Sequence, residues 1–124
     1  MNAVLFNIGT VVIFHWGVSH IVPTRNIVKG VGALSEDNVR IISMEWISEG
    51  LALCFIGFLV FTTTLYLGPQ SQAIKIVGPA SAAMLLLMAT LSVFTGARTS
   101  MIPMQICTVV NTITALLFLA GTYY

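Results

Sequence analysis

Two glutamates and two histidines are the side chains best suited to chemistry in this sequence, and they lie close together along it. Both histidines and all four acidic residues fall within residues 15–49, and the chain after residue 49 carries only Lys75 and Arg98 as charged groups. A carboxyl group beside an imidazole can carry a proton, act as an acid–base pair or hold the polar end of a ligand. We therefore expect any ionisable site in the first half of the chain.

The composition defines the surroundings in which these groups must act. Of the 124 residues, 57% are hydrophobic and only 7% are charged, against about 25% charged residues in an ordinary soluble domain. A soluble protein of this size would expose more apolar surface than water tolerates, whereas a bilayer suits the same composition. A formal net charge of +1 excludes the clustered charge that nucleic-acid binding requires.

Apolar runs separated by helix breakers predict an all-α, integral membrane four-helix bundle that forms a single domain over residues 1–124. Pro23, Gly68-Pro69 and Pro103 mark three of the boundaries. Ser35 is suited to cap the second helix, with acidic residues following it in the first turn. The predicted spans are residues 3–22, 41–67, 74–97 and 103–122, and residues 23–40 form a cytoplasmic loop.

The few basic residues predict the orientation of the bundle. With four spans, both termini lie on the same side as the turn between the second and third helices, and only Lys75 is near that side. The opposite side has four cations, which the positive-inside rule places in the cytoplasm: Arg25, Lys29, Arg40 and Arg98. We therefore expect both termini outside a prokaryotic cytoplasmic membrane.

Depth along the predicted helices pairs the histidines with the glutamates. Counted at 1.5 Å per residue from the start of the second helix, Glu45 lies about 6 Å deep and Glu49 about 12 Å deep. Counted back from the end of the first helix, His20 lies about 4.5 Å deep and His15 about 12 Å deep. Because these helices run antiparallel, we expect His20 level with Glu45 and His15 level with Glu49.

Two further polar residues reach the same depth from the other half of the bundle. Asn111 is about 12 Å deep in the last predicted helix, and Arg98 enters from the third helix at the same surface. We therefore expect one polar pocket in the cytoplasmic third of the bundle. Its ligand-binding or proton-carrying residues are predicted to be His15, Glu49 and Asn111 at the floor, and His20, Glu45 and Arg98 at the mouth.

Structural roles compete with functional ones at these positions. His20 is close enough to the headgroups to be an interfacial residue, and Glu45 can pair with a nearby arginine. His15 and Glu49 can form a purely structural hydrogen-bonded pair. The two histidines are about 140° apart around their helix, so they cannot face the bundle centre equally well.

Metal and haem sites are disfavoured by residue spacing. The Glu-x-x-His spacing of di-iron helical bundles does not occur in the sequence, and both histidines lie on one predicted helix, whereas a bis-histidine haem needs imidazoles from opposing directions. We therefore assign no metal ligands. Cys54 and Cys107 are expected to be small buried apolar residues that do not pair with each other.

The segment His20-Ile-Val-Pro-Thr-Arg25, with the later segment Ile42-Ser-Met-Glu45-Trp46-Ile-Ser-Glu49-Gly50, resembles the DoxX-like class of small bacterial and archaeal four-helix membrane proteins. The likeness covers only the first two predicted helices. It implies a role in membrane-associated oxidoreduction, as a small partner subunit linked to quinone.

The function predicted from these observations is the binding of a quinone or lipid-like molecule, as an accessory subunit of a membrane redox complex. Two alternatives stay open: a proton-coupled transporter of a small solute that uses an intramembrane glutamate, and an intramembrane acid–base enzyme. The expected partners are the lipid bilayer, further copies of the chain or a larger complex, and a small lipophilic ligand. Small-residue stripes on the second and third helices are expected to serve packing.

Overall fold

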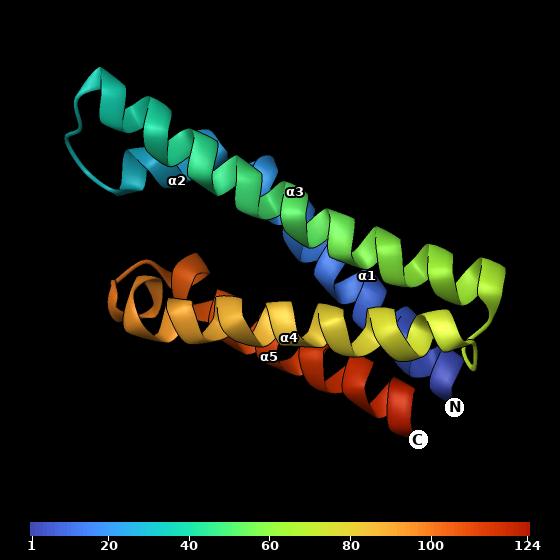
Figure 1. The fold of residues 1–124 in the computed structure, drawn as a ribbon. Coiled ribbons are helices and arrows are strands. Elements are labelled where there is room, and N and C mark those ends of the chain that lie inside the picture. The colour runs from blue at the N-terminus through green and yellow to red at the C-terminus, as the bar shows by residue number, and fades with distance from the viewer.

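The structure is a computed structural model that describes all 124 residues, and its regular elements are all helical (Figure 1). Four long helices are joined by short connections, and one short helix and one 3-10 turn lie among these connections. In chain order the elements are α1 (Asn2–Ile21), α2 (Thr24–Gly30), α3 (Glu36–Leu67), α4 (Gln72–Phe94), η1 (Gly96–Arg98) and α5 (Ile102–Tyr123).

The four long helices match the four predicted spans, and each is long and apolar enough to cross a membrane. The boundaries of α3 and of the preceding loop differ from the prediction. α3 begins at Glu36 rather than at residue 41, because the Ser35 side chain accepts a hydrogen bond from the backbone N–H of Asn38 at 3.2 Å and caps the helix. Within the first turns of α3, Arg40 forms ion pairs with Glu36 and Asp37, at 3.6 and 3.9 Å.

The predicted loop 23–40 contains the helix α2. This helix follows Pro23, and the Thr24 hydroxyl donates hydrogen bonds to the carbonyl oxygens of His20 and Ile21, at 2.9 and 2.8 Å. Val28 is buried, and α2 packs along the start of α3. The segment was predicted to be a loop because it is rich in glycines and charged residues, although one face of α2 is apolar.

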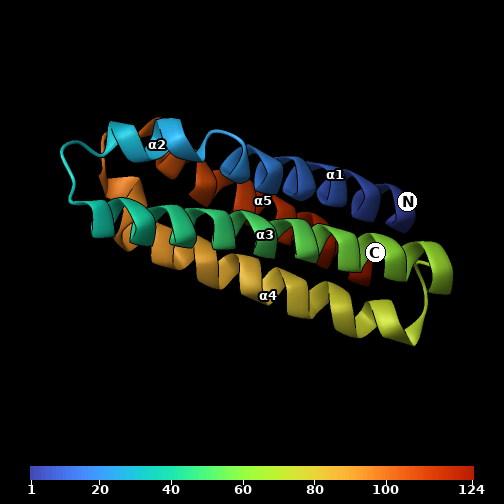
Figure 2. The same cartoon turned by 90° about the horizontal axis from the view of Figure 1, so that it is seen from above.

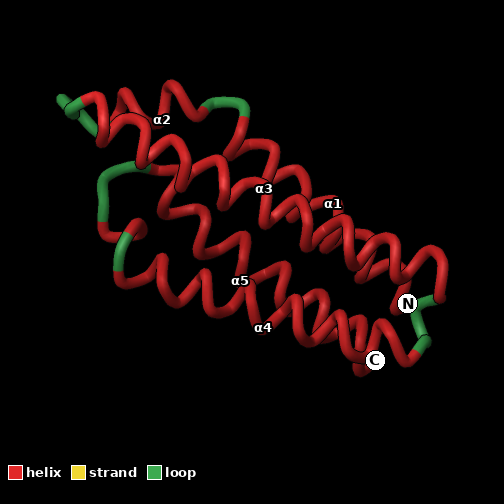
Figure 3. The backbone as a smooth tube through the Cα atoms, turned by 45° about the horizontal axis from the view of Figure 1, so that its top comes forward, coloured by secondary structure: helices red, strands yellow, loops and turns green.

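The long helices form a ring in which α1 contacts α3 and α5, and α4 contacts the same two helices. Figures 1 and 2 show both termini at the same end of the molecule as the α3–α4 turn, as predicted. The other end holds α2 and the connections other than the α3–α4 turn. Figure 3 shows these connections in green. Towards that end, the α1–α3 pair diverges from the α4–α5 pair (Figure 1).

Two glycines bring α1 and α3 into close contact. A Cβ atom added to Gly17 would lie 2.7 Å from the Gly50 carbonyl oxygen and 2.6 Å from Cys54 Sγ. A Cβ atom added to Gly50 would lie 2.8 Å from the Gly17 carbonyl oxygen and 2.9 Å from His20 Cβ. Each glycine therefore faces the other helix's backbone, and the contact sets the register between the two helices.

A phenylalanine joins α1 to the other pair at the end with the termini. Phe6 is fully buried, and its ring lies against Gly78 of α4 and Gly121 of α5. A Cβ atom at Gly121 would lie 3.2 Å from three atoms of this ring. Phe118 of α5 packs against the same ring, with centroids 6.3 Å apart. This end of the bundle is closed by tight apolar packing.

We predict that Gly17→Ala destabilises the fold, because the new methyl group would meet backbone atoms that cannot move away. Overpacking of this kind costs about 1–3 kcal/mol. Thermal unfolding in detergent, followed by circular dichroism, measures the effect.

Gly30→Ala is the matched control, because its Cβ atom would meet only the flexible end of Met101, at 3.4 Å. Equal melting temperatures for the two variants would contradict the assigned role of the α1–α3 contact.

Candidate binding site

The Glu49 carboxylate lies where three helices meet. Its Oε1 atom is 3.8 Å from Nε2 of His20 on α1 and accepts a hydrogen bond from the Cys107 thiol on α5, with Oε1 and Sγ 3.4 Å apart. The Glu49 side chain is 32% exposed, whereas the His20 side chain is 1% exposed. The carboxylate therefore has a buried partner on each side and still reaches an open surface.

His20 is held rigidly between two tryptophans. Its ring stacks on Trp46 with centroids 4.3 Å apart and meets Trp16 edge-on at 5.1 Å. Nδ1 lies 2.9 Å from the Trp16 carbonyl oxygen, and because a carbonyl oxygen can only accept, Nδ1 carries the proton of this bond. In the neutral ring, Nε2 therefore presents a lone pair towards Glu49 and has no hydrogen-bond partner.

Cys107 and Asn111 complete the buried part of the site from α5. The two residues are four apart on one helix face, and Asn111 Nδ2 donates to Cys107 Sγ at 3.5 Å. Asn111 is fully buried. Its predicted place at the floor is therefore consistent with the structure, through the contact with Cys107. The sequence interpretation missed Cys107; its i, i+4 spacing from a buried amide was the available signal.

A cavity of about 550 Å³ opens beside this cluster, between α3 on one side and α4, η1 and α5 on the other. It lies near the end where the two helix pairs diverge (Figure 1). Six of the twelve lining residues are hydrophobic, so the cavity combines apolar walls with a polar set of side chains. This polar set is Glu45, Ser48, Glu49, Ser92 and Thr95, and Cys107, which counts among the six hydrophobic residues, adds its thiol.

The predicted pairing of the histidines with the glutamates was wrong. His20, not His15, lies beside Glu49, and His15 is exposed on the outer face of α1. The depth count assumed that α3 enters the membrane at residue 41, but the glycine contact described above sets a different register. In this register, His15 lies at about the same height along the bundle as Cys54. The Cys54 thiol donates a hydrogen bond to the carbonyl oxygen of Phe14, the residue before His15, at 3.7 Å.

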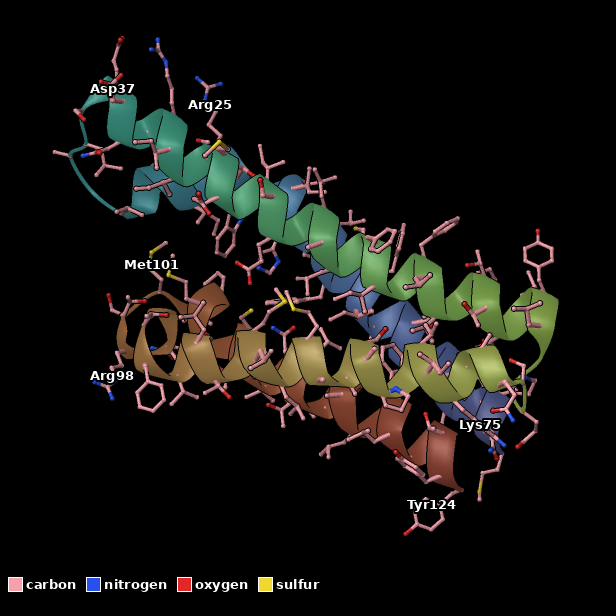
Figure 4. The ribbon with its side chains drawn as sticks, viewed as in Figure 1. Arg25, Asp37, Lys75, Arg98, Met101 and Tyr124 are labelled. Carbon is pink, nitrogen blue, oxygen red and sulfur yellow. The ribbon has the colours of Figure 1, made fainter.

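The other two residues predicted at the mouth, besides His20, separate in the structure. Glu45 is exposed and lines the cavity, as expected. Arg98 points away from α3 at the far side of η1 (Figure 4), with its guanidinium 5.5 Å from the Phe94 ring centroid. The prediction for Arg98 was therefore wrong, because the end of α4 and η1 turn this side chain outward.

Several buried polar atoms around the site have no hydrogen-bond partner. Besides His20 Nε2, they include Trp16 Nε1, Trp46 Nε1 and Asn111 Oδ1. Buried polar groups in proteins are nearly always paired, and these four atoms belong to residues that contact His20 or Cys107 at the site. Nε2 of His20, an oxygen of Glu49 and Sγ of Cys107 also lie within 4.8 Å of one another, close enough to hold a metal ion.

Comparison of the chain with protein-family models, curated proteins and solved structures gives no significant match. The resemblance to DoxX-like proteins stays a prediction. The function must therefore be inferred from the geometry of the site.

We predict that the two histidines differ sharply in their effect on stability. His20→Ala removes a buried ring packed between two tryptophans and should cost about 2–4 kcal/mol of unfolding free energy. His15→Ala removes an exposed ring and should change it by less than about 0.5 kcal/mol. Thermal unfolding of both variants in the same detergent measures the difference, and a larger loss for His15→Ala would contradict the arrangement of α1.

Proposed function

We propose that the chain is an integral membrane protein that binds a lipophilic molecule with a polar head group, in the cavity between α3, α4 and α5. The single observation that carries this proposal is the arrangement of the cavity, which has an apolar wall and, on its inner side, a carboxylate backed by a buried imidazole. Ligand pockets typically combine apolar lining with a few placed polar groups.

The outer surface supports the membrane location. Large apolar side chains are exposed along all four long helices, among them Val11, Phe58, Leu87 and Leu116. Exposed apolar area on this scale is unfavourable in water and suits contact with lipid tails. The ends support the orientation with both termini outside, because Lys75 lies at the end with the termini, and Arg25 and Arg98 lie at the other (Figure 4).

The polar groups suit a quinone or lipid-like head. Glu49 can accept a hydrogen bond from a hydroxyl group, or donate one to a carbonyl oxygen when it is protonated. His20 Nε2, directly behind it, is placed to exchange a proton with the carboxyl group. Met88, Leu91 and Met104 line the apolar part of the cavity, and flexible methionines adapt to ligands of irregular shape.

The role of an accessory subunit in a membrane redox complex follows from this proposal if the ligand is a quinone. A proton-coupled transporter would use Glu49 as its proton carrier, and an enzyme would use Glu49 with His20 as acid and base. These alternatives share the same carboxylate but differ in what they require, since transport needs a gradient and an enzyme needs turnover. Binding of the lipophilic molecule is therefore tested first.

Decylubiquinone, a short-tailed quinone, is the probe for this test. We predict that it quenches the fluorescence of the purified protein saturably, because both tryptophans of the chain, Trp16 and Trp46, pack against His20 beside the cavity. Glu49→Gln should weaken binding at least tenfold, which corresponds to about 1.4 kcal/mol. Extraction of the untreated protein, followed by mass spectrometry, identifies any quinone or lipid that copurifies.

Thr90 on α4 and Thr95, the C-cap residue directly after it, provide a matched pair of variants. Thr95 lines the cavity, whereas Thr90 is exposed outside it, and each hydroxyl donates to the carbonyl oxygen four residues earlier. Thr95→Phe should reduce decylubiquinone binding and Thr90→Phe should not. Binding of a phospholipid in place of the quinone would identify the lipid-like ligand, and unchanged affinity in both Thr95→Phe and Glu49→Gln would refute the cavity as the binding site.

A further inference from the structure

We propose that His20, Glu49 and Cys107 form a three-ligand site for a zinc-type transition-metal ion at the inner wall of the cavity. Each residue comes from a different long helix, and their donor atoms all lie within 4.8 Å of one another. This site shares Glu49 and His20 with the proposed binding of a lipophilic molecule but does not depend on it, and either can be present without the other.

The distances between the donor atoms fit one ion. Zinc bonds of about 2.0–2.1 Å to nitrogen or oxygen and about 2.3 Å to sulfur place tetrahedral donors about 3.3–3.6 Å apart. The observed separations are 3.8 Å from His20 Nε2 to Glu49 Oε1 and 3.4 Å from Cys107 Sγ to Glu49 Oε1. The third pair, His20 Nε2 and Cys107 Sγ, lies within 4.8 Å, so side-chain shifts of up to about 1 Å would bring the donors to ligand geometry.

His20 presents the nitrogen that a metal site needs. Its Nδ1–H donates to the Trp16 carbonyl oxygen at 2.9 Å, which leaves the Nε2 lone pair free and aimed at Glu49. A ligating histidine almost always donates its other N–H to a carbonyl or carboxylate in this way. Nε2 is buried in a side chain that is 1% exposed and has no hydrogen-bond partner, so the metal would satisfy an atom that the protein itself leaves unpaired.

Cys107 is supported in a similar way. Asn111 Nδ2 donates to its sulfur at 3.5 Å, a contact that fixes the position of the sulfur. The thiol proton now bonded to Glu49 would leave when the metal binds. Two of the three ligands therefore have a fixed hydrogen-bond partner behind them.

Charge balance favours a divalent ion at this place. A glutamate carboxylate, a cysteine thiolate and a neutral imidazole together carry a charge of −2, which a divalent ion cancels. Uncompensated charge within a membrane span is costly. With a divalent ion bound, the site has no net charge, whereas the ligands alone would carry −2. Thiolate and imidazole ligands select zinc-type ions over Mg²⁺ and Ca²⁺, which prefer oxygen.

The open side of the site faces the cavity. Glu49 and Cys107 both line that cavity, whereas His20 lies behind them. Three protein ligands with a remaining position open to a pocket are the arrangement of zinc sites that bind a water or a substrate atom. The proposed metal would therefore meet any molecule that enters the cavity.

Metal content and cobalt spectroscopy of the purified full chain test the proposal. We expect one Zn²⁺ bound per chain by elemental analysis after dialysis against Zn²⁺, with Mg²⁺ and Ca²⁺ failing to compete. Co²⁺ in place of Zn²⁺ should give a thiolate-to-cobalt charge-transfer band in the near ultraviolet. Cys107→Ser, which changes a single atom, should abolish this band, and His20→Gln or Glu49→Gln should weaken Zn²⁺ binding at least tenfold.

The chain offers a matched control for two of the ligands. Cys54→Ser and His15→Gln change the same residue types outside the cluster and should leave both the Zn²⁺ content and the cobalt band intact. Loss of the band in Cys54→Ser, equal Zn²⁺ content in wild type and Cys107→Ser, or loading by copper but not by Zn²⁺ or Co²⁺ would each overturn the proposal. A circular dichroism melt of each variant identifies any that has lost its fold. If His20→Gln or Glu49→Gln has lost it, the result for Cys107→Ser alone decides whether the metal site exists. Decylubiquinone binding, measured separately, does not bear on the result.

Discussion

The close contact between Gly17 and Gly50 is the constraint on which the rest of the structure depends. With no side chain on either residue, the backbones of α1 and α3 approach until each carbonyl oxygen lies within 2.8 Å of where the other glycine's Cβ atom would be. Small residues allow such approach where lipid provides no hydrophobic force between helices. Gly17 precedes His20 by three residues and Gly50 directly follows Glu49, so the contact determines which histidine faces which carboxylate.

The polar site and the tight packing of the bundle occupy opposite ends of the molecule. At the end with the termini, Phe6 fills the space against Gly78 and Gly121. At the other end the helix pairs diverge, and the cavity with its carboxylate lies between them. The rigid end holds the helices at a fixed spacing, so that the open end can carry buried polar groups without collapsing around them.

Apolar runs and helix breakers were enough to predict four long helices with alternating directions, because both signals are local. The residues that line the site were harder to predict, since they depend on the rotation and register of each helix. Glu49 and Asn111 were found because buried polar groups are conspicuous in an apolar run. His15 was chosen over His20 because depth alone cannot detect a glycine contact, and Cys107 was passed over because cysteine resembles an ordinary apolar residue until its neighbours are known.

The origin of the three clustered side chains also constrains how the molecule is made. His20 and Glu49 belong to neighbouring long helices in the chain, which can pair as soon as both have been inserted, whereas Cys107 and Asn111 arrive only with the last helix. During synthesis the carboxylate and the imidazole can therefore form only part of the cluster until α5 docks. Completion of the cluster coincides with completion of the fold, so a chain arrested before α5 would present three long helices with an incomplete polar cluster.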